Sequence, residues 1–340
     1  MIVGRQMVSL HTAAGVQLFQ FAPTDVDELR WSRELCDISR CDVSVPTRLV
    51  EDITPWLHWI SVWSEDNQSL LWTGPVQKAT YRRDSTSIEA RDIGALMSRT
   101  RVPITKAWEA TDPAFIAREL WEDMIDLHRL RGKPVVRRDP LADPFNYNTV
   151  ADTQMLDATM DDLVNLGLTW TVVAGTVLLG PAPRTSMASL GEEDFLDGNL
   201  SLVRDGSRVF TDVILRAADS KSRARVNNAG LSLQTIVDVD SLFGVSNADR
   251  ATRQYLRYTS RIRDAVILDG SAMLHPYAPL TIESLVPSVR VTVSAYGAQS
   301  LMELQSMEVS MTSDGASVTV GLESTDDDPP ELIKITDKAR

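Results

Sequence analysis

Short β-rich runs broken by turn residues fill the first hundred residues, and this pattern constrains the fold more than any other feature of the sequence. Partial or strict alternation of apolar and polar residues marks the runs 15–21, 41–45, 57–63, 70–82 and 87–90. Gly74-Pro75 interrupts the fourth of these runs and reads as a break. Many short strands at close spacing predict a small barrel or sandwich.

Five tryptophans fall in the same part of the chain. They are Trp31, Trp56, Trp59, Trp63 and Trp72. Clustered tryptophans belong more often to a core or to a subunit contact than to a ligand cage, because each ring contributes a large apolar area. We therefore expect core or interface positions for them.

The middle of the chain changes to a helical period. Asp112-Pro113 is a typical helix start, and apolar residues follow at three- and four-residue steps, which predicts a helix over 113–130. A second helix is expected over 155–165, and 168–179 is expected to form a hairpin that turns at Ala174-Gly175. The charged, proline-containing stretch 135–150 reads as an ordered loop or extended arm.

Signals are mixed after residue 180. Asp205-Gly206 predicts a hairpin between 200–203 and 209–215, and a polar loop is expected from Ala217. A capping-box-like start at Ser246 predicts a helix that extends through Val266. The last strands are expected at 289–296, 307–311 and 317–322, the final pair turning at Asp314-Gly315, before an acidic mobile tail.

The expected fold class is α+β, mainly β, with two small β-barrel domains and a mixed α/β insertion between them. The predicted parts are a first barrel over 1–100, an insertion over 101–190, connecting strands with an α/β segment over 191–270, second-barrel strands over 271–323 and a tail over 324–340.

Charge and composition exclude several function classes. The 340 residues include 34 Lys and Arg and 47 Asp and Glu, a net charge of −13, which disfavours nucleic-acid binding as the main task. No apolar run approaches the roughly 20 residues of a membrane helix, and Arg5 and Gln6 stand where a signal peptide needs apolar residues. We expect assembly in the cytoplasm, and Cys36 and Cys41 as ordinary thiols.

Catalytic and ligand-binding templates do not match. The four histidines are scattered, and neither a nucleophile elbow, a phosphate loop nor a dinucleotide fingerprint occurs. The acidic groups 192–194 and 326–328 read as solvated faces, and the dispersed arginines 82–83, 137–138, 204, 223 and 225 suit intersubunit salt bridges better than phosphates. The sequence therefore predicts no enzyme activity, cofactor or metal.

Several segments, taken in order, carry a family resemblance. Residues 33–39 (RELCDIS), 72–76 (WTGPV) and 88–92 (IEARD) stand among the first strands, and 278–287 (APLTIESLVP) precedes the strand that ends at 318–322 (VTVGL). These segments resemble the two barrels of the minor tail proteins that form the tail-tip or baseplate hub of long-tailed, non-contractile phages. The family pattern often has Asn where Cys36 stands and Gly where Ser288 stands.

The resemblance implies a structural virion protein rather than an enzyme. It implies a homotrimeric hub at the tail tip that contacts the distal tail ring, tail tube, tape measure protein and tip fibres, with viral DNA passing through the lumen without specific binding. The residues that it marks as interface or structural positions are Trp31, Trp63, Trp72, Gly74, Pro75, Arg91, Asp92, Pro279, Leu285 and Pro287. Two alternatives stay open: a cell-wall hydrolase that uses Glu192 and Asp194, and a receptor- or sugar-binding module.

Overall fold

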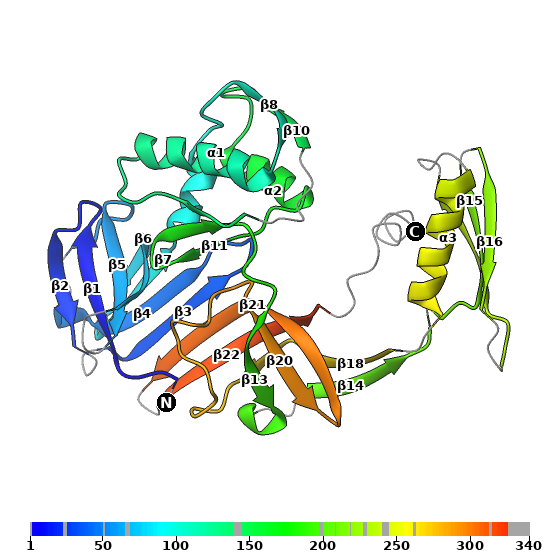
Figure 1. The fold of residues 1–340 in the computed structure, drawn as a ribbon. Helices are drawn as coiled ribbons and strands as arrows, with labels where there is room; N and C mark the ends of the chain where they lie inside the picture. Colours follow the sequence, from blue (N-terminus) through cyan, green and yellow to red (C-terminus); the bar gives the residue numbers. More distant parts are fainter. Residues whose placement is uncertain are drawn as a thin grey trace. The chain divides into compact units, whose positions relative to one another are not determined.

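A computed structural model describes most of the chain and divides it into two compact units. The described residues are 2–22, 26–49, 52–64, 69–138, 145–196, 200–207, 209–217, 219–226, 230–239, 245–260, 263–312 and 315–325. Unit 1 consists of Met1–Asn199, Leu268–Val293 and Leu301–Glu323, and unit 2 of Leu200–Ile267, Ser294–Ser300 and Ser324–Arg340. The fold is α+β and mainly β, as the sequence predicts (Figure 1).

Unit 1 is built on one large sheet of twelve strands. Ten of them lie along one path, in the order β13 (Ser186–Gly191), β20 (Arg290–Ala295), β21 (Ala298–Thr312), β3 (Glu28–Glu34), β4 (Arg40–Pro46), β7 (Ser85–Arg91), β6 (Leu70–Tyr81), β5 (His58–Ser64), β1 (Gln6–Thr12) and β2 (Gln17–Phe21). The other two, β22 (Gly315–Ser324) and β19 (Ser271–Met273), pair with each other, and β22 also pairs with β21.

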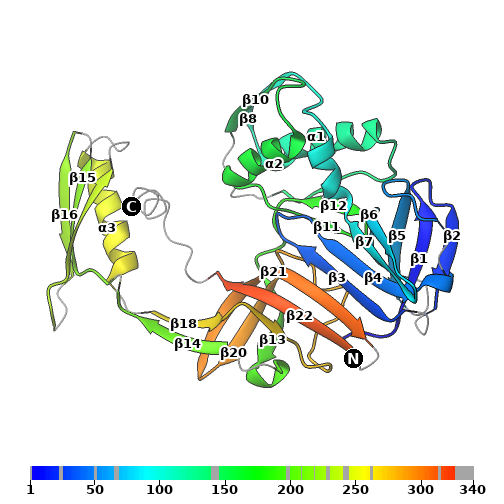
Figure 2. The ribbon, with the colours of Figure 1, turned by 180° about the vertical axis from the view of Figure 1, so that it is seen from behind.

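Strands from the two ends of the chain share this sheet. Strand β21 pairs with β3 in antiparallel fashion from Ser306–Glu34 to Met311–Leu29. Figures 1 and 2 show β3 and β21 side by side from both directions. Residues 272 to 282 positions apart in the sequence therefore depend on each other for backbone hydrogen bonds.

The C-terminal strands curl back toward β13. From β13 the pairing passes through β20, β21 and β22 to β19. Just beyond β19, Leu274 bridges Phe195, and the Leu196 amide donates to the Met273 carbonyl at 2.8 Å. Phe195 follows β13 through the short 3-10 helix η4 (Glu192–Asp194). The barrel closures and the domain limits expected from the sequence stay predictions.

The expected break at Gly74-Pro75 is wrong, because both residues lie inside β6. Before this point β6 pairs with β5, where Gly74 faces Ile60, and after it β6 pairs with β7, from Val76 onward. Gly74 passes so close to β7 that an added Cβ would lie 1.9 Å from the Arg91 carbonyl oxygen. Glycine is the residue that permits this approach.

The insertion packs as a separate layer of unit 1. It follows η3 (Ile93–Arg99) and contains β8 (Lys106–Thr111), α1 (Pro113–Leu127), β9 (Val135–Val136), β10 (Phe145–Thr149), α2 (Leu156–Asn165), β11 (Trp170–Val173) and β12 (Thr176–Leu179). Both predicted helices and the Ala174-Gly175 hairpin are confirmed, with φ of +49° and +75° at the turn. The 135–150 stretch is more regular than expected, since β9 and β10 occupy its two described ends.

Unit 2 is a small α/β unit with its own core. Strand β15 (Asp212–Ala217) lies between antiparallel β16 (Lys221–Arg225) and parallel β17 (Gln234–Val239). Helix α3 (Val245–Thr259) packs on β15 and β16 and buries Val213 and Leu215. A separate pair joins β14 (Leu200–Asp205) to β18 (Arg263–Leu268).

Three predictions fail in unit 2. The Asp205-Gly206 hairpin is wrong, because β14 pairs with the distant β18 and β15 pairs with β16 and β17. The polar loop from Ala217 is wrong, since 221–225 forms β16, whose alternating small and charged residues carry no apolar signal. The third helix ends at Thr259, and Val266 lies in β18.

The C-terminal strands agree with the sequence. Strand β20 covers Arg290–Ala295, and β21 pairs with β22 as expected, although β21 begins at Ala298, well before the expected start at 307. Asp314 and residues 326–340 of the predicted acidic tail lie outside the described residues.

Gly74→Ala should destabilise unit 1. The new Cβ would collide with backbone rather than with a movable side chain, and overpacking of this kind costs about 2–3 kcal/mol of the free energy of unfolding. Urea unfolding measures this loss. Gly4→Ala is the matched control, because nothing lies within 4 Å of its added Cβ; equal unfolding midpoints for the two variants would contradict the close approach.

Candidate functional site

Asp92 fixes the corner where β7 turns into η3. Its carboxylate accepts the Ser39 and Gly94 amide protons, each at 2.7 Å, and its own amide donates to the Ser39 carbonyl at 3.0 Å. The side chain is only 1% exposed. Asp92 therefore caps η3 and ties it to the β3–β4 turn.

Burial changes the acidity of this carboxyl. Loss of solvent raises the pKa of Asp92 to about 6, although the hydrogen bonds from Ser39 and Gly94 oppose the rise. A buried carboxylate without a cation is costly, and its backbone donors keep it in place. The arrangement is that of a structural cap.

Arg33 connects three segments inside unit 1. Its guanidinium donates to the carbonyls of Ile282 at 2.8 Å, Leu285 at 3.0 Å and Leu71 at 3.1 Å, and it lies 5.2 Å from the centre of the Trp31 ring. Arg33 is 2% exposed, and burial lowers its pKa to about 10, so it stays charged at neutral pH. Strands β3 and β6 and the segment 278–289 are thereby held together.

The tryptophans predicted as structural or interface residues occupy different environments. Trp31 is fully buried and donates its indole N–H to Gln6 Oε1 at 2.8 Å, and Trp72 is 2% exposed. Trp63 is partly exposed and donates to Ser9 Oγ at 2.9 Å. The core prediction holds for Trp31 and Trp72, and a subunit contact at Trp63 stays a prediction.

The other predicted residues form two groups. Gly74, Pro75, Arg91 and Asp92 meet at the β6–β7 corner, where Gly74 and Pro75 are buried and Arg91 is partly exposed. Pro279, Leu285 and Pro287 lie on the segment 278–289, where Leu285 and Pro287 are buried and Pro279 is exposed. Arg33 lies within the motif at 33–39, and no sequence signal distinguishes it from a surface arginine.

Cys36 and Ser288, the two residues that depart from the family pattern, both have a left-handed backbone conformation. Cys36 has φ of +55° and Ser288 has φ of +76°. Asn and Gly, which the pattern often has there, adopt this conformation at the lowest cost. Ser288 has a compensating contact, because its Oγ accepts the buried Ala182 amide at 2.8 Å.

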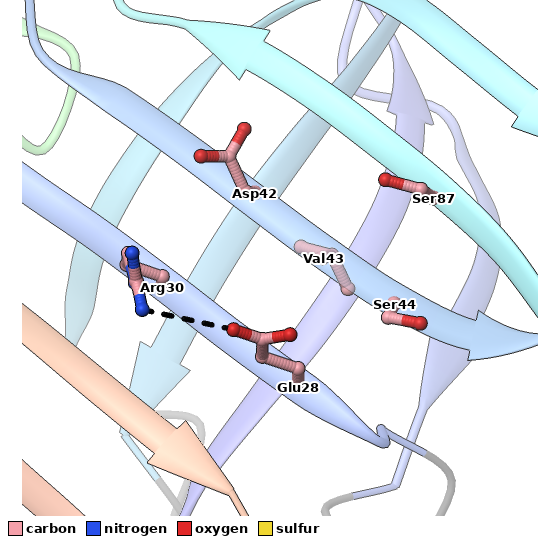
Figure 3. Close-up of a pocket in the computed structure, with 6 residues that line it drawn as sticks. All are labelled: Glu28, Arg30, Asp42, Val43, Ser44 and Ser87. Carbon is pink, nitrogen blue, oxygen red and sulfur yellow. Dashed lines mark ion pairs between the residues drawn. The ribbon is translucent and has the colours of Figure 1, made fainter.

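A small hollow lies on the outer surface of β3, β4 and β7 (Figure 3). Its volume is about 100 Å³, and Glu28, Arg30, Asp42, Val43, Ser44 and Ser87 line it. Arg30 lies 3.8 Å from Glu28 and 3.5 Å from Glu308, so paired charges dominate this hollow. Its size suits a few water molecules.

A larger hollow of about 710 Å³ lies where the insertion meets the β5–β6 region. Its lining residues are Ala13, Trp56, Leu57, Trp59, Pro75, Leu96, Arg99, His128 and Leu130. Arg99 lies 5.7 Å from the centre of the Trp56 ring, and His128 contacts Thr100 Oγ1 at 2.8 Å. Its walls combine apolar side chains with Arg99 and His128.

The acidic group 192–194 has a structural task as well. The Asp194 carboxylate accepts a hydrogen bond from the Gly191 amide at 2.8 Å, and the Asp194 carbonyl accepts one from the His275 amide at 2.7 Å.

Among the described residues, no group of three or more His, Cys, Asp or Glu side chains could hold a metal ion. Within the same residues, no helix combines the length and apolar content needed to cross a bilayer.

Comparison with known proteins gives matches in structure alone. No protein-family model matches the sequence, and no curated protein matches it either. The 43 kDa tail protein of prophage MuSo2 from Shewanella oneidensis superposes with a TM-score of 0.60 at 13% identity, over 94% of this chain and 98% of that protein. The tail protein from Neisseria meningitidis MC58 gives 0.59 at 13% identity, over 95% and 97%.

A third solved structure points the same way. Prophage tail protein gp18 from Listeria monocytogenes EGD-e gives a TM-score of 0.50 at 11% identity, over 99% of this chain and 98% of that protein. The chain has the fold of phage tail proteins. The resemblance found on sequence motifs is thus confirmed at the level of the fold.

Asp92 should give the protein a distinctive pH dependence. Its folded pKa of about 6 lies above the ordinary value of 3.8, so its favourable contribution is complete below pH 3.8 and is lost as the pH rises through 6. Asp92→Asn should be destabilised most at low pH, because an amide accepts only one of the two backbone N–H groups cleanly, and the advantage of the wild type should shrink as its buried carboxyl ionises.

The measurement is the pH dependence of the stability that Asp92→Asn loses relative to wild type. The difference in unfolding free energy between wild type and Asp92→Asn should shrink by roughly 2 kcal/mol between pH 4 and pH 7. The exposed Asp84→Asn removes the same formal charge and serves as the control. A difference that is constant with pH, or that grows toward pH 7, would contradict the buried, proton-binding carboxyl.

Proposed function

We propose that this chain is a structural virion protein that forms the homotrimeric hub at the tail tip, or baseplate, of a long-tailed phage. The observation that carries the proposal is the extent of the structural match: the fold agrees with phage tail proteins over 94–95% of this chain and 97–98% of theirs. This support is an analogy at the level of the fold, since one fold can carry several functions.

The use of polar side chains supports a structural role. Arg33 bonds three backbone carbonyls, Asp92 bonds two backbone amides, and Asp194 bonds the Gly191 amide. Each of these buried or capping groups holds the chain rather than facing a reacting group. This arrangement does not support the alternative of a hydrolase that uses Glu192 and Asp194.

The proposed trimer would place three copies around a pore. The N-terminal strands of unit 1 and its C-terminal strands would alternate around the ring, matching a sixfold tube on one side and threefold parts on the other. Closed rings of this kind use head-to-tail contacts. The distal tail ring, tail tube, tape measure protein and tip fibres would be its neighbours, and viral DNA would leave through the lumen when the hub opens.

Light scattering after size exclusion tests the oligomer. The expected mass is three times the 37.7 kDa of one chain. Pro279→Glu places a charge at an exposed, predicted interface residue and should weaken the trimer at least tenfold, because a desolvated charge opposes association. Val150→Glu, at a residue that is 48% exposed and outside the predicted interface, should leave the trimer intact.

Electron microscopy of virions tests the location. A tagged chain should appear at the tail tip with threefold density. The proposal would be contradicted if the protein stayed monomeric at all concentrations and was missing from purified tails.

A further inference from the structure

The negative charge of this protein is unevenly distributed. The segment 200–267, which supplies most of unit 2, contains 11 Arg and Lys and seven Asp, a net charge of +4. That leaves 23 basic and 40 acidic residues for the rest of the chain, a net charge of −17. Such asymmetry between parts of one chain indicates an anionic partner for the basic part.

The strand register of unit 2 gathers its cations on one face. Arg216 faces Lys221, Ile214 faces Arg223, and Asp212 faces Arg225 across β15 and β16. Because successive side chains on a strand point to opposite faces, these residues share one face, and buried Val213 and Leu215 share the other face, which packs on α3. We call the first of these the basic face: Arg216, Lys221, Arg223 and Arg225.

Carboxylates neutralise part of the basic face. Arg223 forms a two-point hydrogen-bonded pair with buried Asp212, and Arg216 lies 3.9 Å from Asp238. Lys221 and Arg225 are exposed. Arg225 faces Asp212 across the strand pair, and its charge adds to that of Arg223 in lowering the pKa of Asp212, whereas Lys221 has no ion pair within the described residues. The Asp212 pair fixes Arg223 between Lys221 and Arg225.

The spacing of these cations suits a regular polyanion. Lys221, Arg223 and Arg225 stand at alternate positions of β16, so their Cα atoms repeat at about 6.6–6.8 Å. The phosphates of one nucleic-acid strand rise about 3.4 Å per step along the axis and also wind around it, so neighbouring phosphates lie farther apart than 3.4 Å, which suits the wider repeat of these cations. Arginine suits phosphate oxygens because its planar fork donates two parallel hydrogen bonds.

We propose that the basic face of unit 2 binds the phosphate backbone of nucleic acid without reading its sequence. The basic face and its neighbours Ile214, Gln234 and Ile236 include no aromatic side chain on which bases could stack. The inference rests on the proposed function for its biological ligand, since DNA would pass this protein at the tail tip. It runs against the sequence-based expectation that Arg223 and Arg225 suit intersubunit salt bridges better than phosphates.

Fluorescence anisotropy with a labelled 20-nucleotide single strand and a 20-base-pair duplex tests the proposal on the full chain. Wild type should bind both probes at about 50 mM salt and lose at least tenfold in affinity at about 200 mM. Lys221→Glu/Arg225→Glu should bind at least tenfold more weakly at low salt, and its salt slope on the duplex should fall by about 2.

The matched control lies in the same unit. Arg253→Glu/Arg257→Glu changes the same charge on exposed positions of α3, on the opposite face of the sheet, and should keep most of the affinity. Equal losses in both variants would overturn the proposal, because bulk charge would then explain the binding. Circular dichroism checks folding, and Lys221→Gln/Arg225→Gln replaces the charge-reversal variant where that one fails to fold.

Light scattering on the same samples separates this proposal from the proposed function. A trimer that binds neither probe overturns the nucleic-acid proposal alone. Loss of the trimer in Lys221→Glu/Arg225→Glu, without probe binding by wild type, also overturns it and assigns the face to an acidic protein surface. A monomeric wild type that binds both probes through this face contradicts the hub and leaves the binding face standing.

Discussion

A single buried guanidinium holds the ends of this chain together. Arg33 lies on β3, and its three carbonyl acceptors belong to β6 and to the segment 278–289, which leads into β20. Removing a charge from water costs several kcal/mol, so this position is stable only while the three carbonyls, the Glu283 charge and the Trp31 ring stay in place around Arg33. The requirement is mutual, because the Ile282 and Leu285 carbonyls lose their partner if Arg33 moves.

The backbone pairing of β3 with β21 depends on the same arrangement. Strand β21 pairs with β3 along six residue pairs. The insertion and most of unit 2 lie between these two strands in the sequence. Such distant pairing is entropically costly to form and needs strong contacts in the folded state. Arg33, the Trp31 ring and buried Leu285 supply them, and the Gly74 approach and the Asp92 cap hold the neighbouring β6–β7 corner.

Local features were predictable from the sequence, and distant pairings were not. Ala174-Gly175 and the Asp112-Pro113 helix start carry their own conformational preferences, so the hairpin and α1 follow from short windows. The Asp205-Gly206 signal is equally good locally, yet the partners of β14 and β15 lie elsewhere in the chain. Strand β16 was missed because its inward residues, Ser222 and Ala224, are small rather than apolar.

The roles of the candidate residues also depend on contacts that the sequence does not show. The motifs around Trp72, Gly74 and Asp92 carried the family resemblance without indicating their local roles: Gly74 lies inside β6, where its backbone closely approaches Arg91, and Asp92 caps η3. The motif at 33–39 included Arg33 without indicating its buried role, which depends on carbonyls some 250 residues away. The basic face was also hidden, since only the register of β15 and β16 aligns its cations.

Hydrogen exchange followed by mass spectrometry on Arg33→Met tests the central claim most directly. Methionine keeps much of the length of the side chain but donates no hydrogen bond, so three carbonyls lose their donor. The account predicts that amides of β3, β21 and 278–289 exchange at least tenfold faster, all together, while α3 in unit 2 keeps its protection. Faster exchange confined to residues 282–285, or unchanged exchange throughout, would contradict the claim that Arg33 joins the two ends of the chain.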